Sequence, residues 1–400
     1  MASNKPINVG IIGLSTKGWG AVAHSPALAH PSLRSTWNIT ALQTSSAESA
    51  AAAKEIHDKT WSGIRAYHGE DATALSEDSN VDVVTISVKA PLHKAAFDKA
   101  VAAGKDIFVE YPPGRSLEES LEMRRQVQEK GNIRVVVGLQ GRQNATMRKV
   151  KQIIDTGKIG KIRSTTVVAS VPREARFWQP QVTEDVLYLL DKANGATMLS
   201  ICGGHHLDTL MYLLGPFASV SATASTQYPE ISVLSKTTNE VIRTLPSGVA
   251  DHYTFSGPLK SGAHATVVWR STYPTTPGRT QLLWIIDGET GSINFESPDL
   301  GPLPTGLVNM FNPIATVNGQ PLDEYLKAEG IEYSDPQLEL NDGEKGGFIE
   351  FVRRSWIEYG KSLQGGQGEF ATLDDAIEVQ RVVDAIERSA ERGGVAITLN

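Results

Sequence analysis

Over the first 140 residues, short runs of β-branched and other apolar residues alternate with longer alanine-rich or charged segments. This alternation predicts βαβ units around a parallel sheet, because strands covered by helices on both faces are apolar throughout. The expected strands lie at 7–14, 39–43, 81–88, 106–110 and 133–139. The expected helices lie at 46–57, 92–103 and 147–156.

The pattern changes after about residue 150, where strand-like runs follow one another with few helices between them. Such a run predicts a mostly antiparallel sheet. The expected strands are 164–169, 220–224, 252–255, 263–270 and 281–286. The expected helices are 205–214, 347–362 and 373–390. Residues 299–342 are rich in Pro, Gly and Asn, and we expect a long surface excursion there.

A chain of 400 residues exceeds what one core usually supports, so two domains are expected. The predicted fold class is α/β: an N-terminal Rossmann domain with a parallel sheet, followed by an α+β domain with a large, mostly antiparallel open sheet. We place the dinucleotide-binding domain at residues 1–145. The substrate and dimerisation domain, with the C-terminal helices, follows at residues 146–400.

Composition narrows the classes of partner. The net charge of −7 leaves no basic excess for phosphates, which argues against nucleic-acid binding. The basic pairs Arg124-Arg125 and Arg353-Arg354 are expected on solvated helix faces. Cys202 is the only cysteine, so an intramolecular disulfide is impossible. No segment is apolar and long enough for a signal or a membrane span, and we expect a cytoplasmic protein without membrane association.

A glycine turn follows the first predicted strand. Read against the pattern G-x-G-x-x-G, the segment supplies Gly13 and Gly18 but has Ser15 in the middle position. A strand, a glycine turn and a helix start favour binding of a pyrophosphate, although glycine turns also join strands to helices for steric reasons alone. Thr16, Lys17 and Trp19 in the same turn are further candidates for nucleotide contact.

The second strand is followed by hydroxyl side chains. Residues 41–46 contain no Asp or Glu for the ribose 2′-hydroxyl of NAD, whereas Thr44, Ser45 and Ser46 can donate hydrogen bonds to a 2′-phosphate. Lys17 or Lys54 can add positive charge. We therefore favour NADP(H) over NAD(H). The alternative is that these residues cap the helix that begins at residue 47, and one cap can serve both purposes.

Several further segments carry a family resemblance, at 13–19, 24–27, 81–93, 103–112, 138–142, 157–160 and 204–208. Together they resemble the glucose-fructose oxidoreductase and inositol dehydrogenase family, and more closely its branch with the galactose-pathway repressor of yeasts. The resemblance implies a Rossmann domain, an open sheet domain whose exposed face forms a homodimer, and last helices that pack near the first domain. It also implies nucleotide contacts from Val88, His93 and Glu110.

The chemistry departs from the family pattern in two places. The resemblance implies a lysine in a Glu-Lys-Pro motif, but Tyr111 stands there. It also implies an aspartate four residues before His205, where Ile201 stands. A tyrosine, with an ordinary pKa of about 10, needs a cationic neighbour to donate a proton near neutrality. Lys89 can be that neighbour or the donor itself, or a lysine that extends to solvent at a strand end. His205 is the third candidate.

Asp208 follows His205 by one helical turn and can orient its imidazole, or the two form a simple i, i+3 pair. The alternative is a histidine bonded to backbone at a helix start, with His206 as an exposed neighbour. A metal at His205, His206 and Asp208 is disfavoured because no further ligand is recognisable. The other candidates for substrate contact are Arg142, Trp178, Tyr188, Trp269 and Arg270, of which Trp269 is equally consistent with a core or dimer position.

Two functions fit these features. The first is an NADP(H)-dependent oxidoreductase that transfers hydride to or from a small carbonyl, imine or activated alkene, and we favour it. The second is a catalytically silent regulator that senses the dinucleotide and binds a protein partner. A sugar-binding module without redox chemistry ranks third.

Overall fold

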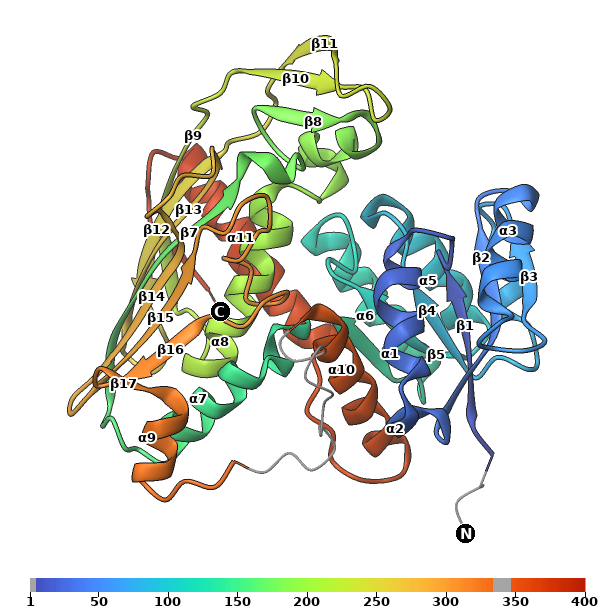
Figure 1. Cartoon of the computed structure of the whole chain (residues 1–400), viewed down its shortest axis with the longest axis horizontal. Helices are drawn as coiled ribbons and strands as arrows, with labels where there is room; N and C mark the ends of the chain where they lie inside the picture. The colour runs from blue at the N-terminus through green and yellow to red at the C-terminus, as the bar shows by residue number, and fades with distance from the viewer. Residues whose placement is uncertain (1–4, 334–346, 400) are drawn as a thin grey trace. The chain divides into compact units, whose positions relative to one another are not determined.

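The computed structural model describes residues 5–333 and 347–399 of the chain. The chain divides into two compact units (Figure 1). The first unit comprises Met1–Gln143 and Glu339–Ile377, and the second comprises Asn144–Leu338 and Glu378–Asn400. The first unit therefore includes α10 (Phe348–Leu363), a helix from near the end of the chain.

The first unit is built on a six-stranded sheet in which every pairing is parallel. Its order, β3-β2-β1-β4-β5-β6, is that of a dinucleotide-binding Rossmann domain and confirms the predicted fold class. The order reverses between β1 and β4, where ligands bind outside the carboxyl ends of the strands. The strands are β1 (Ile7–Ile12), β2 (Trp37–Thr44), β3 (Arg65–His68), β4 (Val83–Ile86), β5 (Asp106–Glu110) and β6 (Val135–Gly138).

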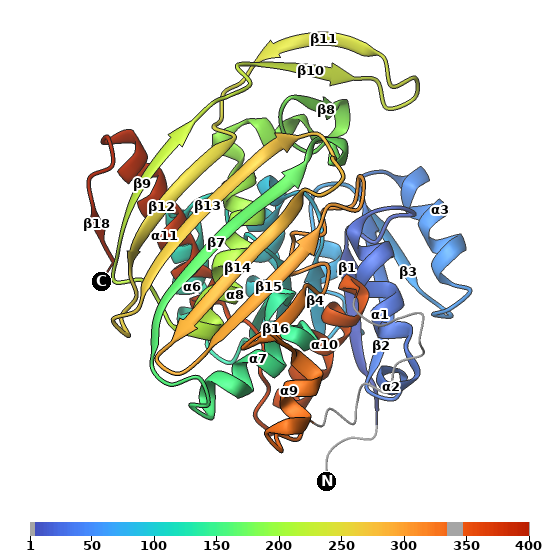
Figure 2. The same cartoon turned by 60° about the vertical axis from the view of Figure 1, so that its left-hand side comes forward.

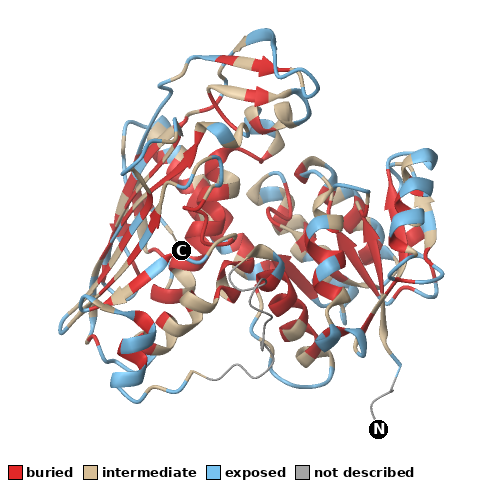
Figure 3. Ribbon diagram, viewed as in Figure 1, coloured by how far each residue is buried: buried red, intermediate tan, exposed pale blue. Residues whose placement is uncertain are grey.

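Helices connect these strands. Figure 3 shows buried residues in red, and every residue of β4 and of β6 is buried. The helices are η1 (Gly20–His24), α1 (Ser25–Ala29), α2 (Pro31–Arg34), α3 (Ala47–His57), α4 (Thr73–Ser76), η2 (Ala90–Leu92), α5 (His93–Ala102), α6 (Leu117–Lys130) and η3 (Gln140–Gln143). The sequence did not predict β3, in which exposed and half-buried residues alternate, nor α6, whose face is strongly charged.

Helix α10 completes the core of the first unit. Its Trp356 and Tyr359 are fully buried and pack on Trp37 of β2, with ring centroids 4.8 and 5.5 Å apart. Trp356 also lies 4.7 Å from the ring of Phe108 on β5. Large aromatic side chains contribute most of the buried apolar area of such a cluster. Of the last two helices, α10 thus packs on the Rossmann sheet, as the resemblance implies, whereas residues from Glu378 onward belong to the second unit.

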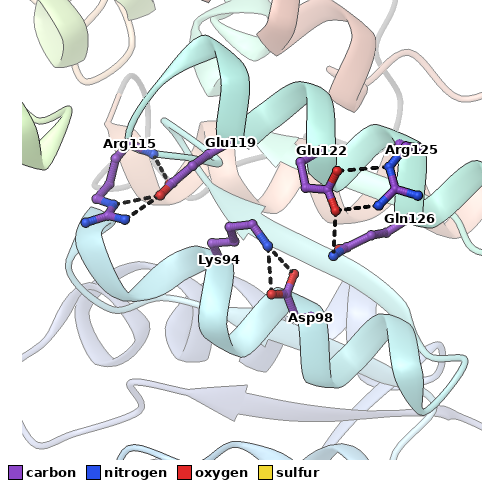
Figure 4. A network of polar contacts seen from close by, with 7 residues as sticks. All are labelled: Lys94, Asp98, Arg115, Glu119, Glu122, Arg125 and Gln126. Carbon is purple, nitrogen blue, oxygen red and sulfur yellow. Dashed lines mark hydrogen bonds and ion pairs between the residues drawn. The ribbon is translucent and has the colours of Figure 1, made fainter.

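The two basic pairs have different environments. Arg125 lies on the exposed face of α6 and forms an ion pair with Glu122 (Figure 4), so the expectation of a solvated face is confirmed there. It was wrong for Arg353-Arg354, whose residues are 2% and 5% exposed. Arg354 instead forms a buried ion pair with Glu350 at 2.8 Å. This pair offsets the cost of removing the guanidinium charge from water. The charged residues of α10 predict a solvated face, but tertiary packing buries this arginine pair.

The second unit is built on a nine-stranded sheet of order β17-β16-β15-β14-β7-β13-β12-β9-β18. Among its described strands, β7 and β13 pair in parallel and the other neighbours are antiparallel. This confirms the predicted mostly antiparallel sheet. The strands are β7 (Ile162–Pro172), β9 (Ser219–Ser225), β12 (His252–Pro258), β13 (His264–Tyr273), β14 (Thr280–Gly288), β15 (Ser292–Pro298), β16 (Ile314–Val317), β17 (Gln320–Pro321) and β18 (Ile397–Thr398).

The second unit also contains a smaller sheet of order β11-β10-β8. Its strands are β8 (Gln181–Thr183), β10 (Glu230–Leu234) and β11 (Val241–Pro246). The longer helices of this unit are α7 (Ala145–Asp155), α8 (Gly204–Leu214), α9 (Leu322–Ala328) and α11 (Leu373–Glu391), whose first residues belong to the first unit. Short helical turns are η4 (Arg173–Ala175), η5 (Glu184–Leu190), η6 (Lys192–Asn194) and η7 (Leu199–Gly203).

The two faces of the large sheet differ. Trp269, Trp284 and Phe295 point inward and are fully buried, whereas Leu283, on the opposite face of β14, is 42% exposed. Helix α8 packs on the inner face, where the ring of His206 lies 4.9 Å from that of Trp284. Figure 2 shows the sheet with α8 behind it. One face therefore forms the core of this unit, as the alternating pattern of the strands requires.

The prediction of a surface excursion at 299–342 was wrong for part of this range. Strand β16 pairs with β15 and extends the large sheet, and α9 follows it. Four apolar and β-branched residues are too few to give a periodic signal, which explains why the sequence did not reveal this strand. The end of the excursion, at 334–342, lies outside the described residues. Of the helices described, none is both long and apolar enough to cross a membrane.

Candidate nucleotide and catalytic site

The turn after β1 admits only glycine at position 13. Gly13 has a φ of +97°, and a Cβ placed there would lie 2.1 Å from the carbonyl oxygen of Ser87. The Gly13 N–H donates to the carbonyl oxygen of Gln43 at 2.8 Å. The turn is therefore packed between the carboxyl ends of β2 and β4, at the reversal point of the sheet order. A positive φ together with this close backbone approach explains the glycine.

Ser15 gives the turn its shape in place of a second glycine. Its hydroxyl accepts the N–H of Gly18 at 2.8 Å, and its carbonyl oxygen lies 3.0 Å from Nε2 of His57. Thr16 and Lys17 at the tip are exposed. The turn leads into a helical run from Gly20, so its backbone N–H groups lie at a helix start, the arrangement that attracts phosphate.

Trp19, the last predicted nucleotide contact of the turn, stacks on Phe348 of α10 with ring centroids 5.0 Å apart. Its ring is half-buried. The helix from near the end of the chain therefore holds the end of the glycine turn as well as the core beneath it.

The hydroxyl residues after β2 form a cap. Ser46 is the N-cap of α3 and accepts the N–H of Ser49 at 3.2 Å, which confirms the capping alternative for this residue. The Thr44 hydroxyl donates to the carbonyl oxygen of Ser46 at 3.2 Å, and Ser45 is exposed. Lys54 forms an ion pair with Asp58 at 2.5 Å. Because Lys54 is paired with Asp58, Lys17 on the glycine turn is the better placed of the two lysines considered for contact with a 2′-phosphate.

The loop after β4 is tied to the loop after β5. Strand β4 ends at Ile86, two residues earlier than predicted, so Lys89 lies three residues beyond the strand and not directly after it; the residue is exposed. The ring of His93 is buried, with Nδ1 2.8 Å from the carbonyl oxygen of Pro112 and Nε2 3.0 Å from that of Val88. Burial lowers the pKa of His93 despite these two contacts. The structure thus gives His93 a role in holding the two loops.

The carboxylate at the end of β5 has a fixed partner. Oε1 of Glu110 lies 2.6 Å from Nε2 of His24 on η1. The Trp356 indole N–H of α10 donates to Nδ1 of the same histidine at 3.1 Å. Tyr111, the next residue of the chain, is buried. His24 and Trp356 were not predicted as site residues. The resemblance at 24–27 carried a signal for His24, but none for Trp356.

Arg142 lies beyond the end of β6, in η3, and forms an ion pair with Asp375 of α11 at 3.0 Å. Burial alone would raise the pKa of Asp375, but the charge of Arg142 and hydrogen bonds from Thr372 bring it below its ordinary value. The ion pair therefore holds the arginine beyond the carboxyl end of β6. Its assignment to substrate stays a prediction.

The second unit holds the remaining predicted site residues. His205 and Asp208 are both buried on α8, and Trp178 is also buried, while Tyr188 on η5 is half-buried. Burial and the charge of Asp185 raise the pKa of Tyr188. Trp269 lies fully inside the core, the alternative considered for it. Arg270, on β13, is half-buried. The roles of all six in catalysis or substrate binding stay predictions.

The structure places His206, the residue after His205, in the core of the second unit. The alternative interpretation of His205 made His206 its exposed neighbour, and that part was wrong: the His206 side chain is buried between α8 and the sheet, against Trp269 and Trp284. The cause is that α8 presents both positions to interior surroundings. Burial lowers the pKa of His206 to about 3, so the ring is neutral. Over residues 5–333 and 347–399, no group of three or more His, Cys, Asp or Glu is placed to hold a metal.

Comparisons with known proteins decide the family. Residues 7–139 match the model described as an oxidoreductase family with an NAD-binding Rossmann fold, and residues 145–297 match that of the Gal80p C-terminal domain. The dehydrogenase aclE of Aspergillus oryzae is 30% identical over 393 residues, which cover 98% of each chain. The chain belongs to this oxidoreductase family.

The relatives of this oxidoreductase-family chain include a regulator as well as dehydrogenases. The galactose/lactose metabolism regulatory protein GAL80 of Saccharomyces cerevisiae is 26% identical, over 99% of this chain and 94% of the relative. A solved structure of a super-repressor mutant of Gal80p from that yeast superposes with a TM-score of 0.80 at 20% identity, covering 98% of each chain. Levoglucosan dehydrogenase, in complex with NADH and L-sorbose, superposes with a TM-score of 0.73 at 23% identity, covering 98% of this chain and 99% of that one. These two structures share the fold.

Proposed function

We propose that this chain is an NADP(H)-dependent oxidoreductase that acts on a small carbonyl, imine or activated alkene. The observation that carries the proposal is the turn at Gly13, which only glycine fits and which lies at the reversal point of a Rossmann sheet. A dehydrogenase that is 30% identical over nearly the whole chain supports the enzymatic reading. The family supports nucleotide binding, and the choice of NADP(H) rests on residues of this chain.

The end of β2 supports the choice of NADP(H). No carboxylate occurs at 41–46 to repel a 2′-phosphate or to bind a 2′-hydroxyl. Ser45 is exposed there, and Lys17 is exposed on the glycine turn. A phosphate at this edge would gain hydrogen bonds from hydroxyls and charge from an ammonium, at no cost in carboxylate repulsion.

The bound nucleotide would supply or accept the hydride. The chain must then deliver a proton to the substrate oxygen or nitrogen, or take one away. Tyr111, Lys89 and His205 are the proposed donors. Tyr111 is buried at the end of β5, while Lys89 is exposed beyond β4, a neighbouring strand of the same sheet. A nearby ammonium would lower the pKa of a phenol and make it a better proton donor.

The first test follows NADPH absorbance against a panel of aldehydes, sugars, ketones and cyclic imines, beside a titration of NADPH and NADH binding. We expect tighter binding of NADPH than of NADH, and turnover with at least one class of substrate. Tighter binding of NADH would refute the choice of nucleotide. Failure to bind either nucleotide would refute the proposed function as a whole.

A second function is favoured by two observations. The chain is similar to GAL80 regulators, and it has Tyr111 and Ile201 where the resemblance implies a lysine and an aspartate. Under this alternative the chain senses the dinucleotide and binds a protein partner without catalysis. Tight NADPH binding with no turnover across the panel would favour it over the enzyme.

We also propose a homodimer through the outer face of the large sheet. The strand register places Leu283 beside Val168, and Val168 beside Val268, so their side chains form an aliphatic stripe across β14, β7 and β13. Ile314 of β16, 63% exposed, lies two strands further along on the same row, with the exposed Glu296 of β15 between it and Leu283. A second copy would bury this stripe. Light scattering should give the mass of a dimer, and Leu283→Glu should give a monomer; a monomeric parent chain would refute the proposal.

A further inference from the structure

The Glu110 carboxylate, at the carboxyl end of β5, is held from two sides. On one side Oε1 receives a short contact of 2.6 Å from Nε2 of His24. On the other side the backbone of Gly138, its register partner on β6, lies so close that a Cβ there would be 2.6 Å from Oε2. The side chain is 14% exposed, so it is nearly enclosed but reaches the surface of the first unit.

The contacts of His24 define which of its nitrogens carries the proton. The indole N–H of Trp356 can only donate, so Nδ1 of His24 must be the acceptor and bears no proton. The proton of the neutral ring is then on Nε2, where it is donated to the Glu110 carboxylate. Trp356 therefore selects the one tautomer that can bind Glu110. A hydrogen bond of this kind, with an ionised acceptor, is stronger than a neutral one.

Aromatic side chains fix the orientation of the histidine ring. His24 is fully buried and meets the rings of Phe108 and Trp356 edge-on, at centroid distances of 5.0 and 5.9 Å. Trp356 is itself packed against Trp37. The ring cannot rotate without disturbing this cluster, because protein cores are close-packed. Segments from η1, β5 and α10 are thus combined to hold a single carboxylate.

We propose that His24 is a positioning residue, which with Trp356 holds Glu110 ready to bind the nicotinamide half of the nucleotide. A Rossmann sheet consists of two mononucleotide-binding halves, and β4, β5 and β6 form the half beyond the reversal point. Glu110 is the last residue of the central strand of that half. A carboxylate there can accept hydrogen bonds from a ribose hydroxyl or a carboxamide. The inference rests on the proposed function, since it presumes that a nucleotide binds.

The test compares two substitutions of the same residue. His24→Leu removes the donor but keeps the volume, whereas His24→Gln keeps an N–H at about the reach of Nε2. We expect His24→Leu to weaken NADPH binding roughly tenfold or more, the cost of a lost hydrogen bond to a charged group. His24→Gln should restore most of the affinity. Thermal melting without nucleotide shows whether either variant is destabilised.

A second pair of variants reaches the same carboxylate from the opposite side. Gly138→Ala places a methyl group 2.6 Å from Oε2, so the Glu110 carboxylate must leave its position, and NADPH binding should weaken to a similar extent. Gly347→Ala is the matched control, because a Cβ there meets no atom of the described residues within 4 Å, and its affinity should equal that of the parent chain.

The outcomes separate the inference from the function on which it rests. If the parent chain binds NADPH and both His24→Leu and Gly138→Ala bind it equally well, the positioning role is refuted and the proposed function stands. Equal losses in His24→Leu and His24→Gln, each with a lowered melting temperature, would also refute it, since a structural role predicts no rescue. If the parent chain binds neither NADPH nor NADH, both proposals fall together.

Discussion

His206 makes the second unit sensitive to acid. Its ring is 2% exposed, lies against two tryptophans, and has no hydrogen-bond partner among the described residues on either nitrogen. Burial lowers its pKa to about 3, whereas an unfolded histidine titrates near 6.5. Between these two pH values His206 is protonated in the unfolded chain but not in the folded chain. The free energy of unfolding therefore falls as the pH falls. From pH 7.5 to pH 5.0 this group alone removes about 2 kcal/mol.

The substitution that tests this is His206→Leu, which keeps the volume and removes both unsatisfied nitrogens. Urea unfolding of the parent and the variant at pH 7.5 and 5.0, followed by tryptophan fluorescence, gives the loss of stability of each protein. The carboxylates change the stability of the parent and of the variant equally between pH 7.5 and 5.0. The difference between the two losses of stability therefore isolates His206 and should be about 2 kcal/mol. His264→Leu, at an exposed histidine of the same unit, is the control and should lose as much stability as the parent. An equal loss in His206→Leu and the parent would refute the reasoning.

Three further predictions concern the first unit. Gly13→Val should reduce NADPH affinity at least a hundredfold in a titration, because its side chain has no room beside the carbonyl of Ser87; unchanged affinity in a folded variant would contradict the turn assignment. Thr44→Asp should weaken NADPH binding about tenfold or more while NADH binding is retained, since a carboxylate repels the 2′-phosphate; equal effects on both nucleotides would contradict this. Tyr111→Phe combined with Lys89→Met should lower turnover about a hundredfold or more under the enzymatic proposal, and steady-state rates that survive both changes would move the proton donor elsewhere.

The architecture could be predicted because it is encoded in repeated local patterns. Each buried parallel strand is a short apolar run, and five of the six in the first unit were found from such runs. Strand β3 was missed because Arg65-Ala-Tyr-His68 alternates half-buried with exposed positions at the edge of the sheet, where polar side chains are tolerated. Periodicity reports which residues face solvent, so a short strand at an edge resembles a loop.

The environment of individual charged residues could not be predicted, because it depends on contacts between distant segments. Nothing near His24 in the sequence announces Trp356, 332 positions away. Likewise, Arg354 appears surface-exposed from local composition, but the packing of α10 buries it beside Glu350. The glycine turn could be predicted because its shape depends on backbone geometry, which a local motif encodes. Side-chain partners are set by the tertiary fold.

The site combines a framework fixed by the backbone with chemistry carried by replaceable side chains. The backbone of Gly13 lies against the carbonyl of Ser87, and the His93 ring joins the loops after β4 and β5 through their backbone carbonyl oxygens, so changing either residue disturbs this framework. Tyr111 and Ile201, by contrast, can replace a lysine and an aspartate without altering any strand. A fold of this kind can therefore keep its nucleotide while its reaction changes or disappears, and enzyme and regulator can share one architecture. Nucleotide affinity tests what both functions require, and only turnover distinguishes them.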